Sequence, residues 1–316
     1  MTVAEAYAKW QTEYWTVSGN LLENTIRGYL SIYKKHLLPI IGNCLITAID
    51  FDTLQVYYNN LCNNGISPKT IRNINQALDS LLNWCFFRKL IPAEPSKSIV
   101  LPKKRGQNTV CNVLSEDEWI TVRPYIIGHY RLALLFLVET GIRSEEIAIQ
   151  KSNIDFNKKL LYIRTATKRS YTDYENRKTT LIVSEYLKSK AAYRSIPITP
   201  YVKYILYRQA NMLQQKHIKS DYIFCNSKGG IIDTRNLLRA FHTALKKAGL
   251  QPRGLNSLRK LYIKRMVKNS MDPKILQKIV GHEEYSTTMK YYLNISDEDK
   301  ICEAMRIYHK MYIDNL

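Results

Sequence analysis

Residues 280–292 of the chain read VGHEEYSTTMKYY, which places His282 nine residues before Tyr291. Gly281 is expected to end one helix, and Ser286 is expected to cap the next. A phenol that faces a phosphodiester can attack the phosphorus and hold it covalently, without water or metal. A tyrosine on a short amphipathic helix is more often a packing residue, and the chain contains 23 tyrosines. The stretch is therefore a candidate nucleophile site that needs support from the rest of the chain.

The charge of the chain indicates a polyanionic partner. The sequence holds 47 Lys and Arg against 27 Asp and Glu, a formal net charge of +20 over 316 residues. Such an excess favours DNA, RNA or an anionic membrane. No apolar run reaches the roughly 18–20 residues of a membrane span, and no signal peptide opens the chain. We therefore expect a nucleic-acid partner and no membrane association.

The remaining composition indicates a cytoplasmic protein without a metal or cofactor. The six cysteines are scattered and include no C-x-x-C pair. Free thiols in a reducing compartment explain this pattern better than disulfides or a zinc site. No cluster of carboxylates with metal-site spacing is present either, so we expect no metal and no cofactor.

The pattern of apolar residues predicts a mostly α protein with one small antiparallel β-sheet. Residues 1–90 read as a helical module, and the proline-containing, basic stretch 91–111 reads as a linker. Residues 112–316 are mainly helical again, with strand character between 160 and 197. Side chains that can cap helices stand at Thr2, Asp50, Ser67 and Ser115, the last within a capping box.

Candidate DNA-contacting residues lie in the first module and the linker. Ser67 and Pro68 begin a helix, and Lys69, Thr70 and Arg72 follow in its first turn. Backbone donors and the helix dipole favour a phosphate at this position. A solvated polar face explains the same residues equally well. Further candidates in the linker are Lys103, Lys104 and Arg105.

Two arginine-containing segments precede the histidine and tyrosine. In the first, Gly141 ends a helix over 130–140 and Arg143 stands at the start of the next, with Glu146 one turn on to orient local groups. In the second, Arg259 lies one turn after Asn256 at the start of a helix. A guanidinium offers a planar fork that matches two phosphate oxygens. The first segment alone is weak evidence, because an arginine at a helix start is usually just solvated.

The histidine is predicted to follow a short amphipathic helix. Asp272 and Pro273 supply its start, and Gly281 its end. A lone histidine after such a helix is more often a capping or core residue than a ligand. The residues expected to face inward from this helix are Ile275, Ile279 and Val280.

Taken in order, these motifs resemble the tyrosine recombinase (phage integrase) family. The run from Thr140 to Glu146 looks like its first arginine box, and the segments at Asn256–Arg259, Gly281-His282 and Ser286–Tyr291 look like its second. The resemblance covers nearly the whole chain. It implies a helical core-binding domain followed by a mixed α/β catalytic domain. It also implies catalytic roles for Arg143, Arg259 and His282, with Tyr291 as nucleophile.

Two positions of the family pattern need separate comment. The stretch from Lys188 to Pro197 is similar to the lysine-to-proline strand of conjugative-transposon integrases, and it makes Lys188 the expected general acid. Lys168 is the alternative, because residues 168–187 could form an inserted hairpin. The family usually has histidine where this chain has Asn256. An amide can donate a hydrogen bond to a phosphate but cannot carry charge or shuttle a proton.

The resemblance implies a site-specific recombinase that cleaves and rejoins DNA through a 3′-phosphotyrosine, without ATP or metal. It further implies double-stranded DNA as substrate, a homo-tetramer on that DNA, and possible accessory DNA-bending proteins. An amphipathic stripe after Ser296 is expected either to dock on a neighbouring protomer or to cover its own core. No small arm-binding domain is visible before the helical module, which favours a simple recombinase, an invertase or a truncated chain.

Two rival functions fit part of this pattern. A type IB topoisomerase-like enzyme would share the nicking chemistry but would relax supercoils as a monomer. A non-catalytic DNA-binding protein could retain the fold without the reaction, and Asn256 is the residue that favours this alternative. A recombinase and a topoisomerase-like enzyme can be distinguished by their products. A non-catalytic DNA-binding protein can be distinguished from both because it would form no covalent adduct.

Overall fold

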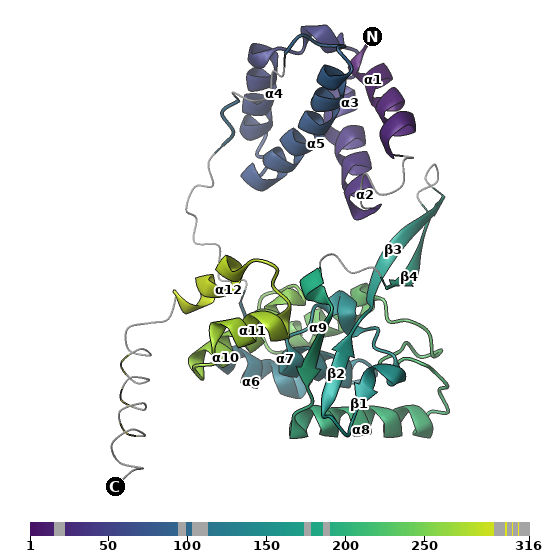
Figure 1. The fold of residues 1–316 in the computed structure, drawn as a ribbon, viewed down its shortest axis with the longest axis vertical. Coiled ribbons are helices and arrows are strands. Elements are labelled where there is room, and N and C mark those ends of the chain that lie inside the picture. The colour runs from purple at the N-terminus through teal and green to yellow at the C-terminus, as the bar shows by residue number, and fades with distance from the viewer. Residues whose placement is uncertain are drawn as a thin grey trace. The chain divides into compact units, whose positions relative to one another are not determined.

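The computed structural model describes residues 1–15, 23–93, 99–102, 113–173, 178–185 and 190–293, together with residues 301, 305 and 309. The chain divides into two compact units, Met1–Thr109 and Val110–Leu316, each of which has its own helices (Figure 1). The predicted C-terminal docking helix lies largely outside the described residues. Among the described residues, no helix is long and apolar enough to cross a membrane.

Unit 1 is helical, as the sequence predicts. The side chains of Thr2, Asp50 and Ser67 each accept a hydrogen bond from the backbone at a helix start, which confirms all three predicted caps. Its core is built around an apolar stripe on the last helix, in which Ile71, Ile74, Leu78 and Leu81 are fully buried. The elements are α1 (Val3–Trp10), η1 (Gln11–Trp15), α2 (Glu23–Ile32), η2 (Tyr33–Leu37), α3 (Leu38–Ile41), η3 (Ile46–Ala48), α4 (Phe51–Asn63) and α5 (Pro68–Phe87).

The described part of the predicted linker packs on unit 1. Ile91 is buried there, and Ile99 and Leu101 lie against the same core. Val100 exchanges two hydrogen bonds with the side chain of Gln55. These contacts anchor Ile91 and the described residues 99–102 to the core of unit 1. Three predicted DNA-contacting residues fall outside the described residues: Lys103, Lys104 and Arg105.

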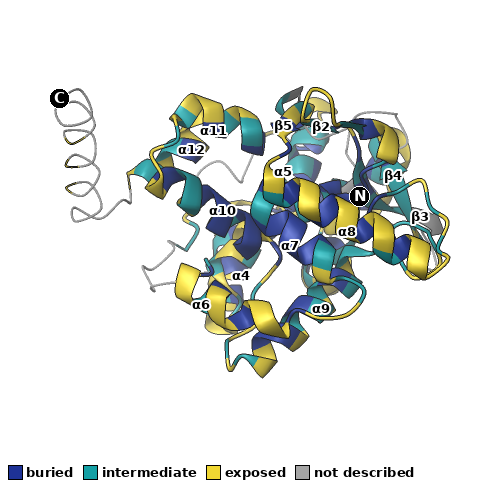
Figure 2. Ribbon diagram, turned by 90° about the horizontal axis from the view of Figure 1, so that it is seen from below, coloured by how far each residue is buried: buried dark blue, intermediate teal, exposed yellow. Residues whose placement is uncertain are grey.

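Unit 2 is built around α7 (Arg131–Thr140), which Figure 2 shows largely buried, and α10 (Asn256–Lys268), which is buried along part of its length. α8 (Pro200–Gln215) turns an exposed face outward. Residues 133–138 of α7 are all buried. Ser115 and Glu118 form the predicted capping box at the first helix of this unit. Its helices are α6 (Glu116–Val122), η5 (Arg123–Tyr125), α7 (Arg131–Thr140), η6 (Ser144–Ile147), η7 (Lys151–Asn153), η8 (Lys190–Ala192), α8 (Pro200–Gln215), α9 (Thr234–Lys247), α10 (Asn256–Lys268), α11 (Pro273–Val280) and α12 (Tyr285–Tyr292).

The strands form two antiparallel sheets rather than the single small sheet predicted. β1 (Ile154–Asp155), β2 (Leu160–Ile163) and β5 (Arg194–Pro197) make a three-stranded sheet in the order β1-β2-β5. β3 (Ala166–Asp173) and β4 (Lys178–Ser184) pair only with each other, in a ribbon that projects from the body of unit 2 (Figure 1). The alternative of an inserted hairpin, raised for residues 168–187, is therefore present in the fold.

Two details of the C-terminal helices correct the sequence interpretation. α12 begins at Tyr285 with the extended residue Glu284 as its N-cap, so Ser286 lies inside the helix and does not cap it. In α11, Ile275 is 54% exposed, whereas Leu276 and Val280 are fully buried. The buried face follows the four-residue spacing from Leu276 to Val280, and Ile275 falls one position off it.

Candidate active site

The four candidate catalytic residues come from the ends of four helical elements in unit 2. Arg143 is the N-cap of η6, directly after α7, and Arg259 lies in the first turn of α10. His282 follows the end of α11, and Tyr291 lies near the end of α12. The fold brings them together: Arg143 donates to the carbonyl of Gly281, next to His282, and Arg259 donates to the carbonyl of Gly141, two residues before Arg143. The rings of His282 and Tyr291 lie 6.4 Å apart. The sequence segments are thus parts of one site.

Gly141 joins α7 to α10 at the base of the site. Its φ of +63° is in the left-handed region, and an added Cβ would lie 2.2 Å from Cδ1 of Tyr262 on α10. Its carbonyl oxygen accepts a hydrogen bond of 2.7 Å from Nη1 of Arg259. Only glycine combines this backbone conformation with so close an approach. Gly141 therefore ends the helix before Arg143 and also positions Arg259.

Glu146 is the buried acceptor that organises two arginines. Its carboxylate accepts a hydrogen bond of 2.9 Å from Nη1 of Arg143. Its two oxygens also accept hydrogen bonds of 2.9 and 2.7 Å from the guanidinium of Arg194 on β5. The side chains of Glu146 and Arg194 are 2% and 5% exposed. Burial by itself raises the pKa of Glu146, but the hydrogen bonds and charge of Arg194 outweigh it and hold that pKa below its usual range. Glu146 is thus ionised, and it fixes Arg143 from behind.

The same two arginines hold the end of α11. Nη2 of Arg143 donates to the carbonyl of Gly281 at 2.7 Å, and Nε of Arg194 donates to the carbonyl of Ile279 at 2.7 Å. Gly281 has φ +69°, and an added Cβ would lie 2.8 Å from the carbonyl oxygen of Ala191. These bonds satisfy carbonyls that a helix end leaves without partners. They also fix the backbone from which His282 projects.

His282 is neutral and linked to the tyrosine helix. Burial, reinforced by the nearby charges of Arg259 and Arg143, lowers the pKa of His282 to about 4. Its Nδ1 lies 2.9 Å from Oγ1 of Thr288. The rings of His282 and Tyr291 are nearly parallel, at 14°, with centroids 6.4 Å apart. Burial raises the pKa of Tyr291 and Arg259 opposes that rise, so the phenol needs an additional charge partner to ionise near neutral pH.

Arg259 carries a buried hydrogen-bond donor that has no acceptor. The residue is 7% exposed, and its Nη2 has no hydrogen-bond partner in the part of the chain that the structure describes. Burial and the adjacent Arg143 lower the pKa of Arg259 to about 10. An unpaired buried donor on a cation is costly, and an anion bound beside it would remove the cost. Arg143, Arg259 and His282 therefore form a site suited to a phosphate.

The hydroxyl groups of the two adjacent tyrosines differ in their bonding. The Tyr292 hydroxyl donates to the backbone carbonyl of Met271. The Tyr291 hydroxyl makes no hydrogen bond within the described residues, and its ring packs at the edge of a small cluster that includes Leu276 and Val280. The Tyr292 hydroxyl is therefore committed to a backbone carbonyl, whereas the role of Tyr291 as the nucleophile stays a prediction.

The other sequence candidates are less completely placed. Asn256 is exposed at the first position of α10, one turn before Arg259, while Lys188 lies outside the described residues. Lys168 pairs with Ile182 within the β3–β4 ribbon. Their roles in catalysis stay predictions. Among the described residues, no group of three or more His, Cys, Asp or Glu side chains is arranged to hold a metal ion.

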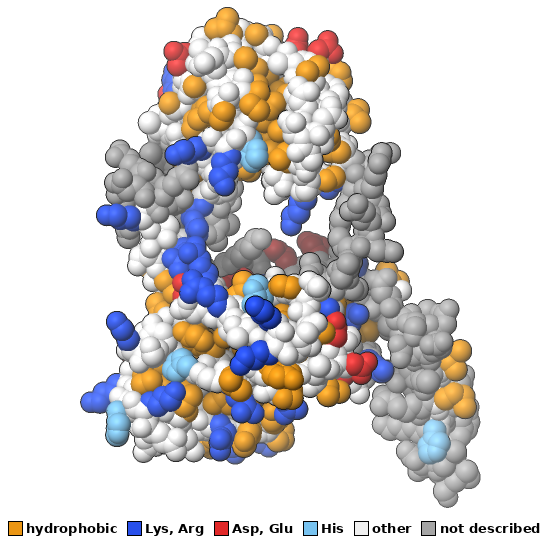
Figure 3. Space-filling view, turned by 180° about the vertical axis from the view of Figure 1, so that it is seen from behind, with side chains coloured by type: hydrophobic (Ala, Val, Ile, Leu, Met, Phe, Trp, Pro, Cys, Tyr) orange, Lys and Arg blue, Asp and Glu red, His pale blue; other side chains and the backbone are white. Residues whose placement is uncertain are grey.

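The candidates for DNA contact in unit 1 also stay predictions. Lys69 and Arg72 are exposed near the start of α5, and Arg72 donates to the carbonyl of Pro102. The Thr70 hydroxyl is 2.8 Å from that of the capping residue Ser67. On the face of unit 1 seen in Figure 3, Lys and Arg side chains gather at one end of the unit and acidic ones at the other.

Arg194 is the residue of this site that sequence reasoning missed. It lay within the Lys188–Pro197 stretch, which was used only to locate a lysine. The signal that could have found it is strand alternation, because Arg194 and the core residue Ile196 lie on the same face of β5. An arginine on the buried face of a strand requires an anionic partner. Glu146 supplies that partner.

Arg194→Met is expected to lower the free energy of unfolding of unit 2 by about 3–5 kcal/mol, because it leaves a buried carboxylate with one partner fewer. The folded-state pKa of Glu146 lies below its unfolded value. Its contribution to stability is therefore present above the usual glutamate range and is lost as the pH falls through the lowered pKa. The difference between wild type and variant should accordingly be largest at neutral pH and shrink in acid, as measured by urea denaturation.

Lys158→Met is the matched control, since the Lys158 side chain is 70% exposed and lies 3.7 Å from Asp155. An exposed pair of this kind contributes about 0–1 kcal/mol. Equal losses of stability in the two variants would contradict the role assigned to the Arg194–Glu146 pair.

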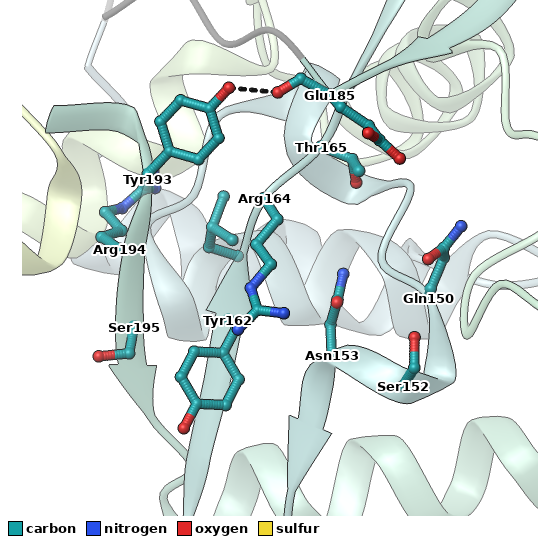
Figure 4. A pocket seen from close by; sticks show the side chains of 11 residues that line it. Gln150, Ser152, Asn153, Tyr162, Arg164, Thr165, Glu185, Tyr193, Arg194 and Ser195 are labelled. Carbon is teal, nitrogen blue, oxygen red and sulfur yellow. Dashed lines mark hydrogen bonds between the residues drawn. The ribbon is translucent and has the colours of Figure 1, made fainter. Parts of the chain in front are cut away.

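A separate pocket of about 760 Å³ lies on the face of the three-stranded sheet away from the core (Figure 4). Tyr162 and Ser195 line it from paired strands, and the Arg164 guanidinium lies 4.8 Å from the Tyr162 ring centroid. Figure 4 shows the Arg194 side chain directed away from Arg164 and Tyr162, consistent with its bonds to Glu146. None of the four candidate catalytic residues lines this pocket, but Arg194 does, so the pocket adjoins the candidate active site.

The arrangement of these side chains suits a protein that transfers phosphoryl groups through a tyrosine. Residues 125–298 match the phage integrase family, and residues 2–62 match the N-terminal SAM-like domain of phage integrases. The chain belongs to the phage integrase family and is a tyrosine recombinase. These matches favour a site-specific recombinase over the topoisomerase-like and non-catalytic alternatives.

Individual relatives agree with this assignment. A tyrosine recombinase XerC-like protein of Caldanaerobacter subterraneus subsp. tengcongensis is 26% identical, over 81% of this chain and 70% of its own. The integrase of Staphylococcus phage L54a is 22% identical, over 81% and 78%. The Tn1549 transposon integrase bound to transposon right end DNA has a TM-score of 0.77 at 20% identity, covering 98% of this chain and 100% of that one. A lambda integrase tetramer bound to a Holliday junction has a TM-score of 0.70 at 15% identity, covering 94% and 79%.

Proposed function

We propose that the chain cleaves and rejoins double-stranded DNA at specific sites through a covalent 3′-phosphotyrosine at Tyr291. The observation that supports this most directly is the buried Nη2 of Arg259, which has no acceptor among the described residues. It lies in a site with two further phosphate-binding groups, Arg143 and His282, and with a phenol that is not committed to another bond. A scissile phosphate would supply the missing acceptor and bring the phosphorus to Tyr291.

In the cleavage step, Oη of Tyr291 forms a bond to phosphorus and the bond from phosphorus to the 5′ oxygen breaks. The phenol loses its proton to solvent, and Lys188 donates a proton to the leaving 5′ oxygen. Arg143 and Arg259 offset the charge that builds on the phosphate oxygens and favour the phenolate. The phosphodiester is exchanged for a phosphotyrosyl ester, so a 5′-hydroxyl from another strand can reverse the step without ATP.

Asn256 takes the position where the family usually has histidine. Its amide can donate to a phosphate oxygen, and its place one turn before Arg259 suits that contact. It cannot accept the phenol proton as an imidazole would. We therefore assign Asn256 to phosphate binding and not to proton transfer.

Assembly and location follow the relatives. The lambda integrase forms a tetramer on a Holliday junction, and we propose a homo-tetramer on DNA for this chain as well. Docking by the segment after Ser296 and accessory DNA-bending proteins would complete that complex. The proposed DNA contacts include Lys69, Thr70 and Arg72, with the linker residues Lys103, Lys104 and Arg105. The proposed site of action is bacterial or phage-associated DNA in the cytoplasm.

The experiment that tests the proposal uses a duplex selected for binding from a random-sequence pool and nicked beside the cleavage position. The nick releases a short strand after cleavage and so traps the covalent complex. We expect a protein–DNA adduct that resists detergent and forms equally in EDTA, since no step uses a metal. Binding without any adduct would contradict the proposal and favour a non-catalytic DNA-binding protein. On a supercoiled plasmid that carries the selected site, relaxed circles without recombinant products would instead indicate a topoisomerase-like enzyme.

A further inference from the structure

Thr288 contacts the candidate histidine from inside the tyrosine helix. It lies one turn before Tyr291 in α12, is 0% exposed, and places Oγ1 2.9 Å from Nδ1 of His282. This is the one hydrogen bond of its hydroxyl within the described residues. The nearby carbonyl of Glu284 accepts instead from the backbone N–H of Thr287. Thr288 is thus a buried polar group whose partner is a titratable ring.

The direction of this hydrogen bond follows from what each atom can offer. A neutral imidazole has one N–H and one acceptor nitrogen, and the bond made by one nitrogen sets the proton on the other. A buried hydroxyl with a single partner leaves its hydrogen unsatisfied if it acts as the acceptor. That is more costly than an unused lone pair. The Thr288 hydroxyl therefore donates to Nδ1, and the ring proton resides on Nε2.

We propose that Thr288 is a positioning residue that holds His282 in the Nε2–H tautomer and so makes it a hydrogen-bond donor toward the scissile phosphate. Nε2 has no partner among the described residues and is the nitrogen available to a ligand. In this tautomer His282 cannot take the phenol proton at Nε2 at the start of the reaction. It acts with Arg143 and Arg259 on the phosphate oxygens. The assignment of a phosphate ligand rests on the proposed function.

The same bond also sets the nucleophile helix against the histidine. Thr288 and Tyr291 lie three residues apart, so they share one face of α12. A bond from Thr288 to His282 therefore fixes the rotation of α12, and with it the near-parallel arrangement of the His282 and Tyr291 rings at 6.4 Å. Tautomer and nucleophile position are thus controlled by a single side chain.

The test compares Thr288→Val, which keeps the shape but removes the hydroxyl, with Thr288→Ser, which keeps the hydroxyl. The full-length protein is labelled with ¹⁵N-histidine and studied by NMR without DNA, using His282→Asn to assign the His282 signals. We expect wild type and Thr288→Ser to show a protonated Nε2 and an unprotonated Nδ1, and Thr288→Val to show both tautomers. Adduct formation with the nicked duplex should fall on the order of tenfold in Thr288→Val and be retained in Thr288→Ser.

A protonated Nδ1 in the wild type would overturn the inference, and so would a Thr288→Val protein that forms the adduct at the wild-type rate. The tautomer spectrum of the wild type decides the matter even where Thr288→Val does not fold. A wild-type protein that shows the Nε2–H tautomer but forms no adduct would instead overturn the proposed function. The two failures are therefore distinguishable.

Discussion

Tyr291→Phe is expected to abolish the covalent DNA adduct, while Tyr292→Phe is expected to form it at a rate close to that of wild type. Phenylalanine keeps the ring that packs beside Leu276 and Val280 and removes the one atom that bonds to phosphorus. The loss should exceed about 10³-fold, since no second nucleophile replaces the phenol. DNA binding should be preserved, because the substitution removes no charge. Both quantities can be measured with the same nicked duplex, by gel shift and by denaturing gel.

Tyr292→Phe is the matched control because the two phenols are adjacent and chemically equivalent. The Tyr292 hydroxyl donates to the carbonyl of Met271, so its removal is expected to cost about 1 kcal/mol of stability and little activity. Both variants should give wild-type circular dichroism. Loss of the adduct in Tyr292→Phe with retention in Tyr291→Phe would show that the nucleophile had been placed one residue too early.

The elements that could be predicted from the sequence are those set by local chemistry. Thr2, Asp50, Ser67 and Ser115 were identified as caps because a side-chain oxygen three residues before a free backbone N–H is a local arrangement. The prediction for Ser286 was wrong because Glu284, two residues earlier, already adopts the extended conformation of a helix start. Glu284 makes no side-chain capping hydrogen bond, so no local capping signal marks the start of α12.

The sequence raised a hairpin over 168–187 as an alternative, but it could not show that this hairpin forms a sheet of its own. Strand character over 160–197 was evident, but pairing depends on contacts between distant residues. β2 pairs with β5, which comes after β3 and β4 in the sequence, while β3 and β4 pair only with each other. The alternation of residues within each strand gives its faces but not its neighbour.

For the candidate active site, the sequence identified the four candidate catalytic residues but not the hydrogen bonds that hold them in place. Arg143, Arg259, His282 and Tyr291 were identified by the order and spacing of motifs, and the structure brings all four to one place. Their supporting bonds join distant residues: Arg194 is 48 positions from Glu146, and Arg259 is 118 from Gly141. No local pattern contains such pairs. Thr288 was part of a quoted motif, yet its contact with His282 depends on how α12 packs against α11.

Arg259→Met is expected to slow adduct formation strongly while leaving the folded protein as stable as wild type, or more stable. The fall in the pKa of Arg259 from its ordinary 12.5 to about 10 reflects burial first and then the charge of Arg143. It corresponds to a cost of about 3 kcal/mol for holding the cation in the folded state without DNA. Methionine fills similar space without charge, and it loses the bond to Gly141, worth about 1 kcal/mol. The substitution thus removes the free-energy cost of the buried cation, which is larger than the stabilisation lost with the hydrogen bond to Gly141.

The activity of this variant should fall by about 10²–10³-fold or more, since one preorganised donor to a transition-state oxyanion contributes that much. Arg259→Lys separates charge from geometry: it keeps the cation but cannot offer the fork that reaches the Gly141 carbonyl and a phosphate oxygen together. We expect it to bind DNA well and cleave it poorly. Thermal unfolding with and without the bound duplex checks both parts, because DNA should raise the melting temperature of wild type more than that of Arg259→Met. An Arg259→Met protein that unfolds at a lower temperature than wild type without DNA would show that the guanidinium stabilises the fold. The unpaired Nη2 would then not be a donor held ready for phosphate.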